Sequence, residues 1–318
     1  MSKKCLCCYE PLVKDETDFH ATCSKKIFGH IHPPIVPFSE TDMQQMANKV
    51  VNRLFIVTGV QPKLSLHLAD KHHKKSLPRF TIVGLWSDYI IKPPVDRYPN
   101  LPELEDTTMH LAQLAAIPTV PHSLIRLNNK KLAYITKRID RNKKEKIHME
   151  DMCQLTERLT EDKYKGSYEQ IAKAIIQYTE NPLIDVIHFF EQIIFAFLTG
   201  NADMHLKNFS LIQNTRGNYQ LAPAYDMVAT TLVVKDDDED LALTLNAKKK
   251  KIKRKDFETA LNLFNIAESA KHSMFQKFAT AIPLWNKCIK KSFLPTTVKN
   301  NYQQLIKKRA ERLELYTR

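Results

Sequence analysis

The sequence predicts an α+β protein with two lobes, a small β-rich first lobe and a larger, mostly helical second lobe. Before residue 140, strand-like alternation of apolar and polar residues dominates, and after it helical spacing dominates. The 318 residues are enough for two domains or one large bilobal unit, and 43% hydrophobic residues can bury a sizeable core. Strands followed by helices are typical of α+β proteins.

The first lobe is predicted at residues 31–140. Its strands are expected at residues 64–68, 80–83, 89–92 and 132–136, with a turn at Gly84. Between the third and fourth strands, residues 103–116 have the spacing of a helix with one apolar face.

The second lobe is predicted at residues 141–318. Its helices are expected at residues 149–159, 168–178, 183–199, 255–266 and 296–316. A strand pair at 209–212 and 219–221 is joined by residues 214–218, whose composition predicts a hairpin turn.

Residues 1–30 form a separate segment rich in cysteine and histidine. Cys5-x-x-Cys8 and His20-x-x-Cys23 are two short hooks of the kind that hold a tetrahedral Zn²⁺ from two sides. Cys7 lies between the first pair and leaves the ligand set open. The alternative is a group of reduced thiols packed against the body of the protein.

The chain is basic, since 48 Lys and Arg against 35 Asp and Glu give a net charge of +13. Such an excess favours polyanionic partners, including nucleic acid and nucleotide phosphates. Seven positive charges fall within residues 248–255, just after the acidic run 236–240. We interpret this region as an exposed, charge-patterned loop, with a nucleic-acid contact as the alternative.

No membrane span is expected, because the most apolar stretch, residues 186–199, is shorter than the ~20 apolar residues needed. The first residues lack the apolar core of a signal peptide. We therefore expect a cytoplasmic protein.

Glycine is scarce, with six residues and no two closer than seventeen positions. This spacing excludes the phosphate-binding motifs that need paired glycines.

The strongest functional signal is the order of Asp203, Asn208 and Asp226. Asn208 follows Asp203 by five positions, and Asp226 comes after the predicted hairpin. Protein kinases place a catalytic Asp, a Mg²⁺-binding Asn and a second Mg²⁺-binding Asp in this order. They also need a strand lysine for the ATP phosphates and a helical glutamate to position it, and Lys92 and Glu105 fit these places.

The chain resembles the HipA family of bacterial Ser/Thr kinase toxins from toxin–antitoxin modules. The resemblance runs from about residue 50 to the end and is carried by residues 59–64, 91–93, 150–154, 201–210 and 225–226. It implies a two-lobed protein-kinase-like fold that transfers phosphate from ATP to a serine or threonine. The shortness of the chain before residue 59 resembles the short forms of the family, which lack the usual N-terminal subdomain.

The resemblance also implies roles for single residues. Asp203 would be the catalytic base, Asn208 and Asp226 would bind Mg²⁺, and Lys92, with Glu105 beside it, would contact ATP. His205 and Tyr225 would lie beside the nucleotide. In a hinge, the backbone of Lys137 and Ile139 would face adenine, and Asp140 would face the ribose. Asp151 and Gln154 match the family motif, and for them we predict a structural role.

The phosphate loop would comprise Gly59, Val60, Gln61 and Lys63, a shortened loop with one glycine. Family members of this kind are regulated by autophosphorylation within the loop, where added charge disturbs ATP binding. Thr58 is the candidate autophosphorylation site, with a plain β-branched strand residue as the alternative. Ala247 replaces the glycine of the family's Asn-Gly-Lys turn.

By resemblance, the target is a protein such as an aminoacyl-tRNA synthetase. The partners would be a helix-turn-helix antitoxin, with DNA contacted only through it, and a small separate protein equivalent to the missing subdomain. Two other functions stay open: a small-molecule kinase on the same scaffold, and a catalytically idle DNA-associated co-repressor.

Overall fold

The computed structural model describes residues 3–51, 63–69, 78–83, 87–142, 145–234 and 238–316. The chain divides into two compact units. Unit 1 comprises Met1–Asp106, Val120–Ile139 and Lys291–Phe293, and unit 2 comprises Thr107–Thr119, Asp140–Lys290 and Leu294–Arg318. The break after Ile139 lies next to the predicted lobe boundary. Residues 107–119, which we expected in the first lobe, fall in unit 2, and the Cys/His segment falls in unit 1.

Unit 1 contains a five-stranded antiparallel sheet in the order β2-β1-β3-β5-β4. The strands are β1 (Leu64–Ala69), β2 (Arg79–Ile82), β3 (Tyr89–Lys92), β4 (His122–Arg126) and β5 (Leu132–Lys137). The four predicted strands are present, and β4 is an addition that the sequence analysis did not anticipate. In the register of β3 with β5, Lys92 lies opposite Tyr134.

The core of unit 1 forms where the N-terminal segment packs on this sheet. The helices are α1 (Ala21–Phe28), α2 (Glu40–Val51) and the first part of α3 (Leu101–Leu114). Phe28 of α1 contacts Phe80 and Tyr89 on the sheet, with ring centroids 6.0 and 5.9 Å apart. Leu6 and Phe19 join the same hydrophobic cluster. The first thirty residues are therefore part of the core of unit 1 and not an appendage.

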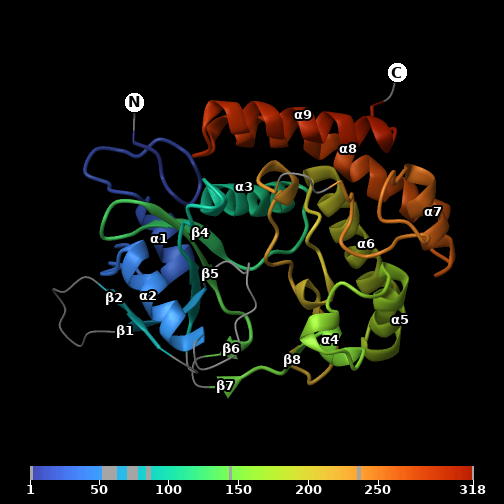
Figure 1. Ribbon diagram of the computed structural model, residues 1–318, viewed down its shortest axis with the longest axis horizontal. Coiled ribbons are helices and arrows are strands. Elements are labelled where there is room, and N and C mark those ends of the chain that lie inside the picture. Colours follow the sequence, from blue (N-terminus) through green and yellow to red (C-terminus); the bar gives the residue numbers. More distant parts are fainter. Residues whose placement is uncertain are drawn as a thin grey trace. The chain divides into compact units, whose positions relative to one another are not determined.

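Unit 2 is mostly helical. Its helices are α4 (Met152–Leu155), α5 (Tyr168–Tyr178), α6 (Pro182–Thr199), α7 (Arg254–Asn262), α8 (Glu268–Lys291) and α9 (Thr296–Arg312). In its central helix, α6, every residue from Phe189 to Thr199 is buried. α5 and α9 both lie against it (Figure 1). The aromatic and β-branched run of α6 thus supplies the core on which the rest of the unit packs.

The structure corrects the expectation that no segment is long enough to span a membrane. The helix begins at Pro182, four residues before the apolar stretch considered, because proline is well suited to the first helical turn. Its 18 residues have a mean hydropathy of 1.5, so by length and composition alone the helix could cross a membrane. However, 72% of these residues are buried inside the structure. α6 therefore has the burial of a core helix.

The predicted helix at residues 149–159 is also wrong. Residues Met149–Asp151 form strand β8, and only Met152–Leu155 are helical. β8 pairs with β9 (Ser210–Gln213), which pairs with β10 (Tyr219–Leu221) as the predicted hairpin. A short two-stranded ladder, β6 (Arg141–Asn142) and β7 (Glu145–Lys146), precedes them.

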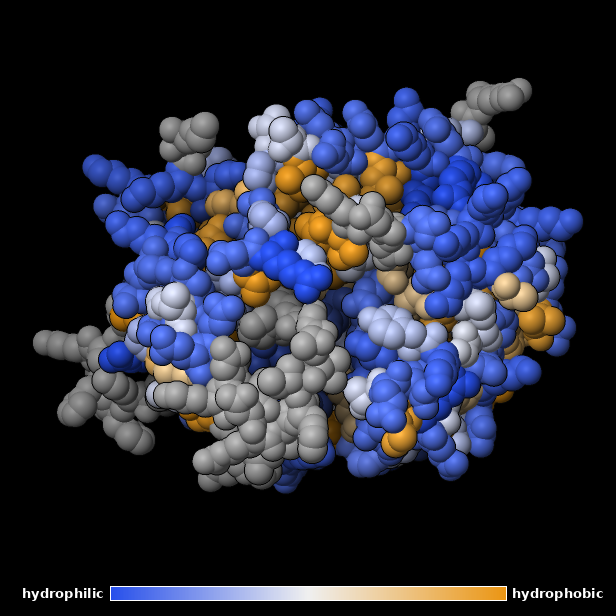
Figure 2. All heavy atoms as spheres, viewed as in Figure 1, coloured by the Kyte–Doolittle hydropathy of each residue, from blue (hydrophilic) through white to orange (hydrophobic). Residues whose placement is uncertain are grey.

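Lysines of the basic run, residues 248–255, form ion pairs with nearby acidic residues. Such pairing agrees with the interpretation of this region as a charge-patterned loop. Lys249 and Lys250 form ion pairs with Glu239 and Asp238, and Lys248 pairs with Asp256. Hydrophilic residues cover most of the face shown in Figure 2.

Candidate active site

The candidate catalytic loop, residues 201–209, begins where α6 ends at Gly200. Gly200 has φ +71°, the left-handed conformation that ends helices, and its N–H bonds the carbonyls of Ala196 and Phe197. A Cβ at this position would lie 2.3 Å from Thr231 Oγ1 and 2.5 Å from Leu305 Cδ2. Backbone conformation and lack of space both favour glycine, so the chain leaves the core helix at a defined point three residues before Asp203.

Asp203 is held by bonds to its backbone and its side chain. Its carbonyl accepts hydrogen bonds from Asn208 Nδ2, at 2.9 Å, and from His205 N, at 2.8 Å. One carboxylate oxygen accepts a bond of 2.6 Å from the hydroxyl of Tyr164, which lies 39 positions earlier in the chain. Because Asn208 donates through its nitrogen, its amide oxygen points away from this bond and can serve as an acceptor for a cation.

Among the described residues, two buried polar atoms without a hydrogen-bond partner lie in this loop. Within the described part of the chain, Asn201 Nδ2 and His205 Nδ1 are buried and lack a hydrogen-bond partner. Burial lowers the pKa of His205, against the opposing effect of the nearby Asp203 and Asp226 carboxylates. Native proteins rarely leave such atoms unpaired unless a ligand or water completes them. The loop therefore has the polarity of a binding site.

Asp226 is placed beside the loop by its neighbour Tyr225. The Tyr225 hydroxyl donates to the Lys207 carbonyl at 3.0 Å and bonds the Ser210 hydroxyl at 2.6 Å. Asp226 itself has φ +57°, a conformation that few residues other than glycine adopt. Strained backbone of this kind clusters at functional sites, because the surrounding structure must support it.

The predicted structural role of Asp151 and Gln154 is confirmed. Asp151 begins α4, and the two residues form a reciprocal capping box through bonds of 3.1 and 2.9 Å. The other oxygen of Asp151 forms an ion pair of 2.6 Å with Lys207 in the catalytic loop. This second contact, which the sequence analysis missed, ties the start of α4 to the loop between Asp203 and Asn208.

In unit 1, Lys92 and Glu105 lie in contact. Lys92 Nζ is 2.7 Å from Glu105 Oε1, and the two residues are only 7% and 1% exposed. The ammonium group also lies 5.5 Å from the centre of the Tyr134 ring. A lysine on β3 paired with a glutamate on α3 is the arrangement that protein kinases use at the ATP phosphates. Burial makes the pair sensitive to loss of either partner.

The predicted hinge residues are all described, whereas of the predicted phosphate loop only Lys63 is described. Lys137 N donates to the Pro121 carbonyl at 2.9 Å, and Asp140 pairs with Arg141 at 2.5 Å. Ile139 ends unit 1. Thr58, Gly59, Val60 and Gln61 lie outside the described residues, and Lys63 is exposed just before β1.

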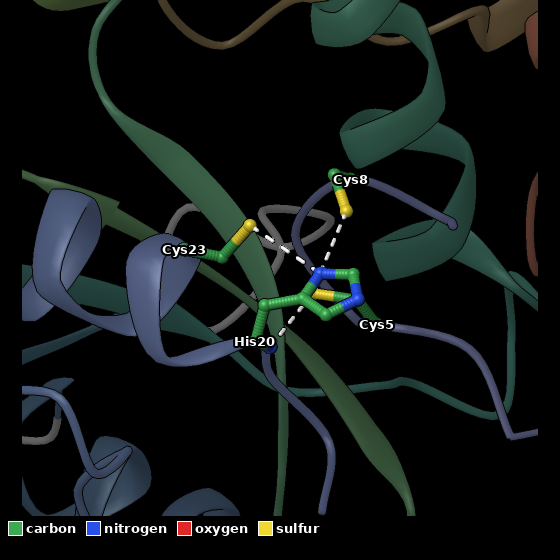
Figure 3. A group of neighbouring side chains, drawn as sticks. All are labelled: Cys5, Cys8, His20 and Cys23. Carbon is green, nitrogen blue, oxygen red and sulfur yellow. Dashed lines mark hydrogen bonds between the residues drawn. The ribbon is translucent and has the colours of Figure 1, made fainter. Parts of the chain in front are cut away.

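The four predicted zinc ligands come together at the start of unit 1. Cys5, Cys8, His20 and Cys23 each offer a ligand atom within 4.8 Å of all the others, whereas Cys7 is not part of this group (Figure 3). Burial raises the pKa of the Cys8 and Cys23 thiols to about 12. A catalytic cysteine needs a lowered pKa, so the raised pKa of these thiols does not favour a role as a nucleophile.

Comparison with known proteins identifies the family. The HipA-like C-terminal domain family matches residues 55–285, well over half of the chain. The chain belongs to this family. It is 33% identical over 248 residues to a predicted kinase of Haemophilus influenzae, and the match covers 71% of this chain and 68% of that protein.

Two Shewanella oneidensis comparisons agree with this assignment. The chain is 26% identical to the serine/threonine-protein kinase toxin HipA over 210 residues, which cover 60% of this HipA-like chain and 46% of the toxin. A structure of HipA from this species with HipB and operator DNA matches with a TM-score of 0.68 and 21% identity, covering 88% of this chain and 72% of that one. The protein therefore has a HipA-like, kinase-like fold, and its sequence match covers under half the length of the HipA toxin.

Proposed function

We propose that this protein is an ATP- and Mg²⁺-dependent kinase that transfers the γ-phosphoryl group to a serine or threonine of a protein. The observation that carries the proposal is the catalytic loop, where Asp203 and Asn208 are bonded to each other and Tyr225 fixes the strained Asp226 beside them. Family membership and the buried Lys92–Glu105 pair support the same reaction.

The chain supplies an acceptor for the substrate proton and oxygen ligands for a cation. The Asp203 carboxylate accepts the proton of the attacking hydroxyl, whose oxygen bonds the γ-phosphorus while the bond to the β–γ bridging oxygen breaks and ADP leaves. The Asn208 amide oxygen and the Asp226 carboxylate would hold Mg²⁺, which supplies positive charge to the phosphate oxygens when bound. Lys92, oriented by Glu105, contacts the other phosphates.

The nucleotide and its regulation follow the family pattern in this proposal. His205 and Tyr225 lie beside the nucleotide, and the Lys137 carbonyl and Ile139 N–H face adenine, since Lys137 N is already bonded to Pro121. Asp140 faces the ribose. Gly59, Val60, Gln61 and Lys63 approach the phosphates, and Thr58 is the site of autophosphorylation.

We further propose that the kinase is the toxin of a cytoplasmic toxin–antitoxin module. The support is the HipA neighbour, which was solved in complex with HipB and operator DNA. A helix-turn-helix antitoxin is the expected partner, together with a small protein equivalent to the N-terminal subdomain of longer relatives. The expected substrate is a translation protein such as an aminoacyl-tRNA synthetase.

The test is incubation of the purified protein with γ-labelled ATP, Mg²⁺ and a cell lysate, comparing the wild type with Asp203→Ala. We expect label on a lysate protein with the wild type and at least a roughly hundredfold loss with the variant, the usual contribution of a general base. Label on metabolites and on no polypeptide would replace the protein-kinase proposal with a small-molecule kinase. Equal labelling by both proteins would refute the mechanism.

A further inference from the structure

The N-terminal Cys/His cluster is not among the residues to which we assign phosphoryl transfer. Cys5 and Cys8 lie on a tight turn whose flanks pair through Cys5 N to the Glu10 carbonyl and Leu12 N to the Lys3 carbonyl. His20 and Cys23 lie at the start of α1, where His20 occupies the N-cap position without capping the helix through its side chain. The ring of His20 instead faces the sulfurs of the three cysteines (Figure 3).

We propose that Cys5, Cys8, His20 and Cys23 bind one structural Zn²⁺ through three sulfurs and His20 Nδ1. In a tetrahedral site with Zn–S of about 2.3 Å and Zn–N of about 2.0–2.1 Å, sulfur and nitrogen lie about 3.6 Å apart. The Nδ1 atom is 3.3 Å from Cys8 Sγ and 3.8 Å from Cys23 Sγ. The spacing is therefore that of a tetrahedral metal site.

The hydrogen bonds around the cluster fit a metal better than a group of thiols. His20 Nε2 lies 3.0 Å from the Pro11 carbonyl, which fixes the proton on Nε2 and turns the lone pair of Nδ1 toward the sulfurs. The single lone pair of Nδ1 can accept only one S–H donor, yet the sulfurs of both Cys8 and Cys23 lie near this atom. Hydrogen bonding between thiols and the imidazole therefore accounts for only one of the two contacts. A cation on that lone pair has both sulfurs as neighbours.

Backbone amides also point at the sulfurs. His20 N donates to Cys5 Sγ at 3.4 Å, and the backbone N–H of Glu10 bonds Cys8 Sγ. The second bond depends on Tyr9, whose φ of +64° turns the chain directly after Cys8. These bonds use the sulfur atoms as acceptors, which is compatible with sulfur as a zinc ligand. Three sulfurs and one imidazole are the soft ligands that Zn²⁺ prefers.

The metal would fasten the first thirty residues to the part of unit 1 that carries the Lys92–Glu105 pair. Between the ligands, the Leu6 carbonyl accepts a bond from Ser123 Oγ of β4 at 3.2 Å. The Tyr9 hydroxyl donates to Asp106 Oδ2 on α3 at 2.6 Å, one residue after Glu105. A second bond of 2.8 Å joins the other oxygen of Asp106 to His122. The zinc site thus holds the residues that position the start of α3.

The first measurement is the metal content of purified, reduced protein, for the wild type and three matched variants. We expect about one zinc per chain in the wild type and in Cys7→Ala, because Cys7 lies outside the ligand group. Cys8→Ala and Cys23→Ala should retain well below one. Less than about half a zinc in the wild type, iron in its place, or equal loss from Cys7→Ala and Cys8→Ala would overturn the proposal.

A second measurement needs no variant and so does not depend on the variants folding. Zinc is removed from the wild type by a chelator, and Co²⁺ is then added in its place. We expect the absorption bands of tetrahedral Co²⁺ with thiolate-to-cobalt charge transfer, and a fall in melting temperature on zinc removal that Zn²⁺ restores and Mg²⁺ does not. An octahedral cobalt spectrum, or a melting temperature unaffected by the chelator, would contradict a structural zinc site.

Discussion

Tyr164 is the residue that most directly orients Asp203. Its hydroxyl is 2.6 Å from the Asp203 carboxylate, and its ring contacts His205 edge-on, with centroids 5.0 Å apart. The tyrosine reaches the catalytic loop from the turn that follows the short 3₁₀ helix Thr160–Asp162. We therefore infer that Tyr164 is a positioning residue, which acts on the proposed phosphoryl transfer through Asp203.

Tyr164→Phe tests this role, because it removes the hydroxyl and leaves the ring. We expect kcat for phosphoryl transfer to fall by about tenfold, the value of one hydrogen bond to a charged group, with KM for ATP unchanged. Tyr178→Phe is the matched control, since Tyr178 is 43% exposed against 44% for Tyr164 and lies at the end of α5. An unchanged or faster kcat in Tyr164→Phe would show that the hydroxyl does not hold the carboxylate for catalysis.

The contacts of single residues show how much of the candidate site the sequence spacing alone can predict. Asp203 and Asn208 could be found because their contact is local, within one loop whose residue order follows from its chemistry. Tyr164 and the Lys207–Asp151 pair could not, since these contacts join segments 39 and 56 positions apart. No periodic pattern marks such pairs in the sequence, and only the folded chain brings them together.

At the scale of elements, the turn at Asn246 and Ala247 is strained by its sequence. Both residues have positive φ, +48° and +59°, and Leu245 and Lys248 bond each other on either side, as in a two-residue hairpin. Such a turn favours Asn-Gly, and alanine at the second position carries the steric cost of its Cβ. Asn246 Nδ2 and Lys248 Nζ both bond Asp256 and hold the turn on α7.

Ala247→Gly should therefore stabilise the protein by about 1 kcal/mol, measured by thermal or denaturant unfolding. The same substitution inside a helix has the opposite sign, because glycine loses more backbone entropy there. Ala279→Gly in α8 provides this control and should destabilise by about 1 kcal/mol. If both variants shift stability in the same direction, the strain at Ala247 is not the controlling factor.

Helix α8 and strand β8 could not be predicted from local sequence patterns, for physical reasons. Proline normally kinks or ends a helix, yet α8 continues through Pro283, and Met274, Phe278, Ile282 and Trp285 are buried at helical spacing. The helix holds partly because Trp285 Nε1 bonds the Leu111 carbonyl at 2.8 Å, a contact that no local pattern shows. The strand β8 likewise exists through its pairing with β9. Tertiary contacts decided both elements.

At the scale of the whole molecule, Asp240 links the loop before the basic run to the last helix. It accepts ion pairs from Arg309, at 2.6 Å, and from Arg312, and a hydrogen bond from Ile252 N at 3.0 Å. Burial would raise the pKa of Asp240, but the two arginines and the amide outweigh burial and lower it. The ion-paired carboxylate thus contributes stability that depends on pH.

The sign of this dependence follows from the lowered pKa. The contribution is present above the unfolded value of about 3.9 and is lost as the pH falls through the folded value. Asp240→Asn should lower the free energy of unfolding by about 3–5 kcal/mol at neutral pH, because it leaves buried arginine charge unpaired. Below about pH 4 the difference in unfolding free energy between wild type and variant should become smaller. Denaturant unfolding between pH 7 and 3 measures both.

Asp238→Asn is the matched control, since Asp238 pairs with Lys250 at the surface and its side chain is 75% exposed. An exposed pair contributes little to stability. Equal losses of unfolding free energy in the two variants would contradict the role of Asp240. So would a difference between wild type and Asp240→Asn that does not change with pH.

We propose that Asp203 takes part in phosphoryl transfer and does not merely bind nucleotide. The most direct measurement is transfer from γ-labelled ATP by purified wild type and Asp203→Asn, with the Kd for Mg·ATP measured on the same samples. We expect similar nucleotide affinity in both proteins and a loss of transfer of at least about hundredfold in the variant. Undiminished transfer by Asp203→Asn, or no ATP binding by the wild type, would contradict it.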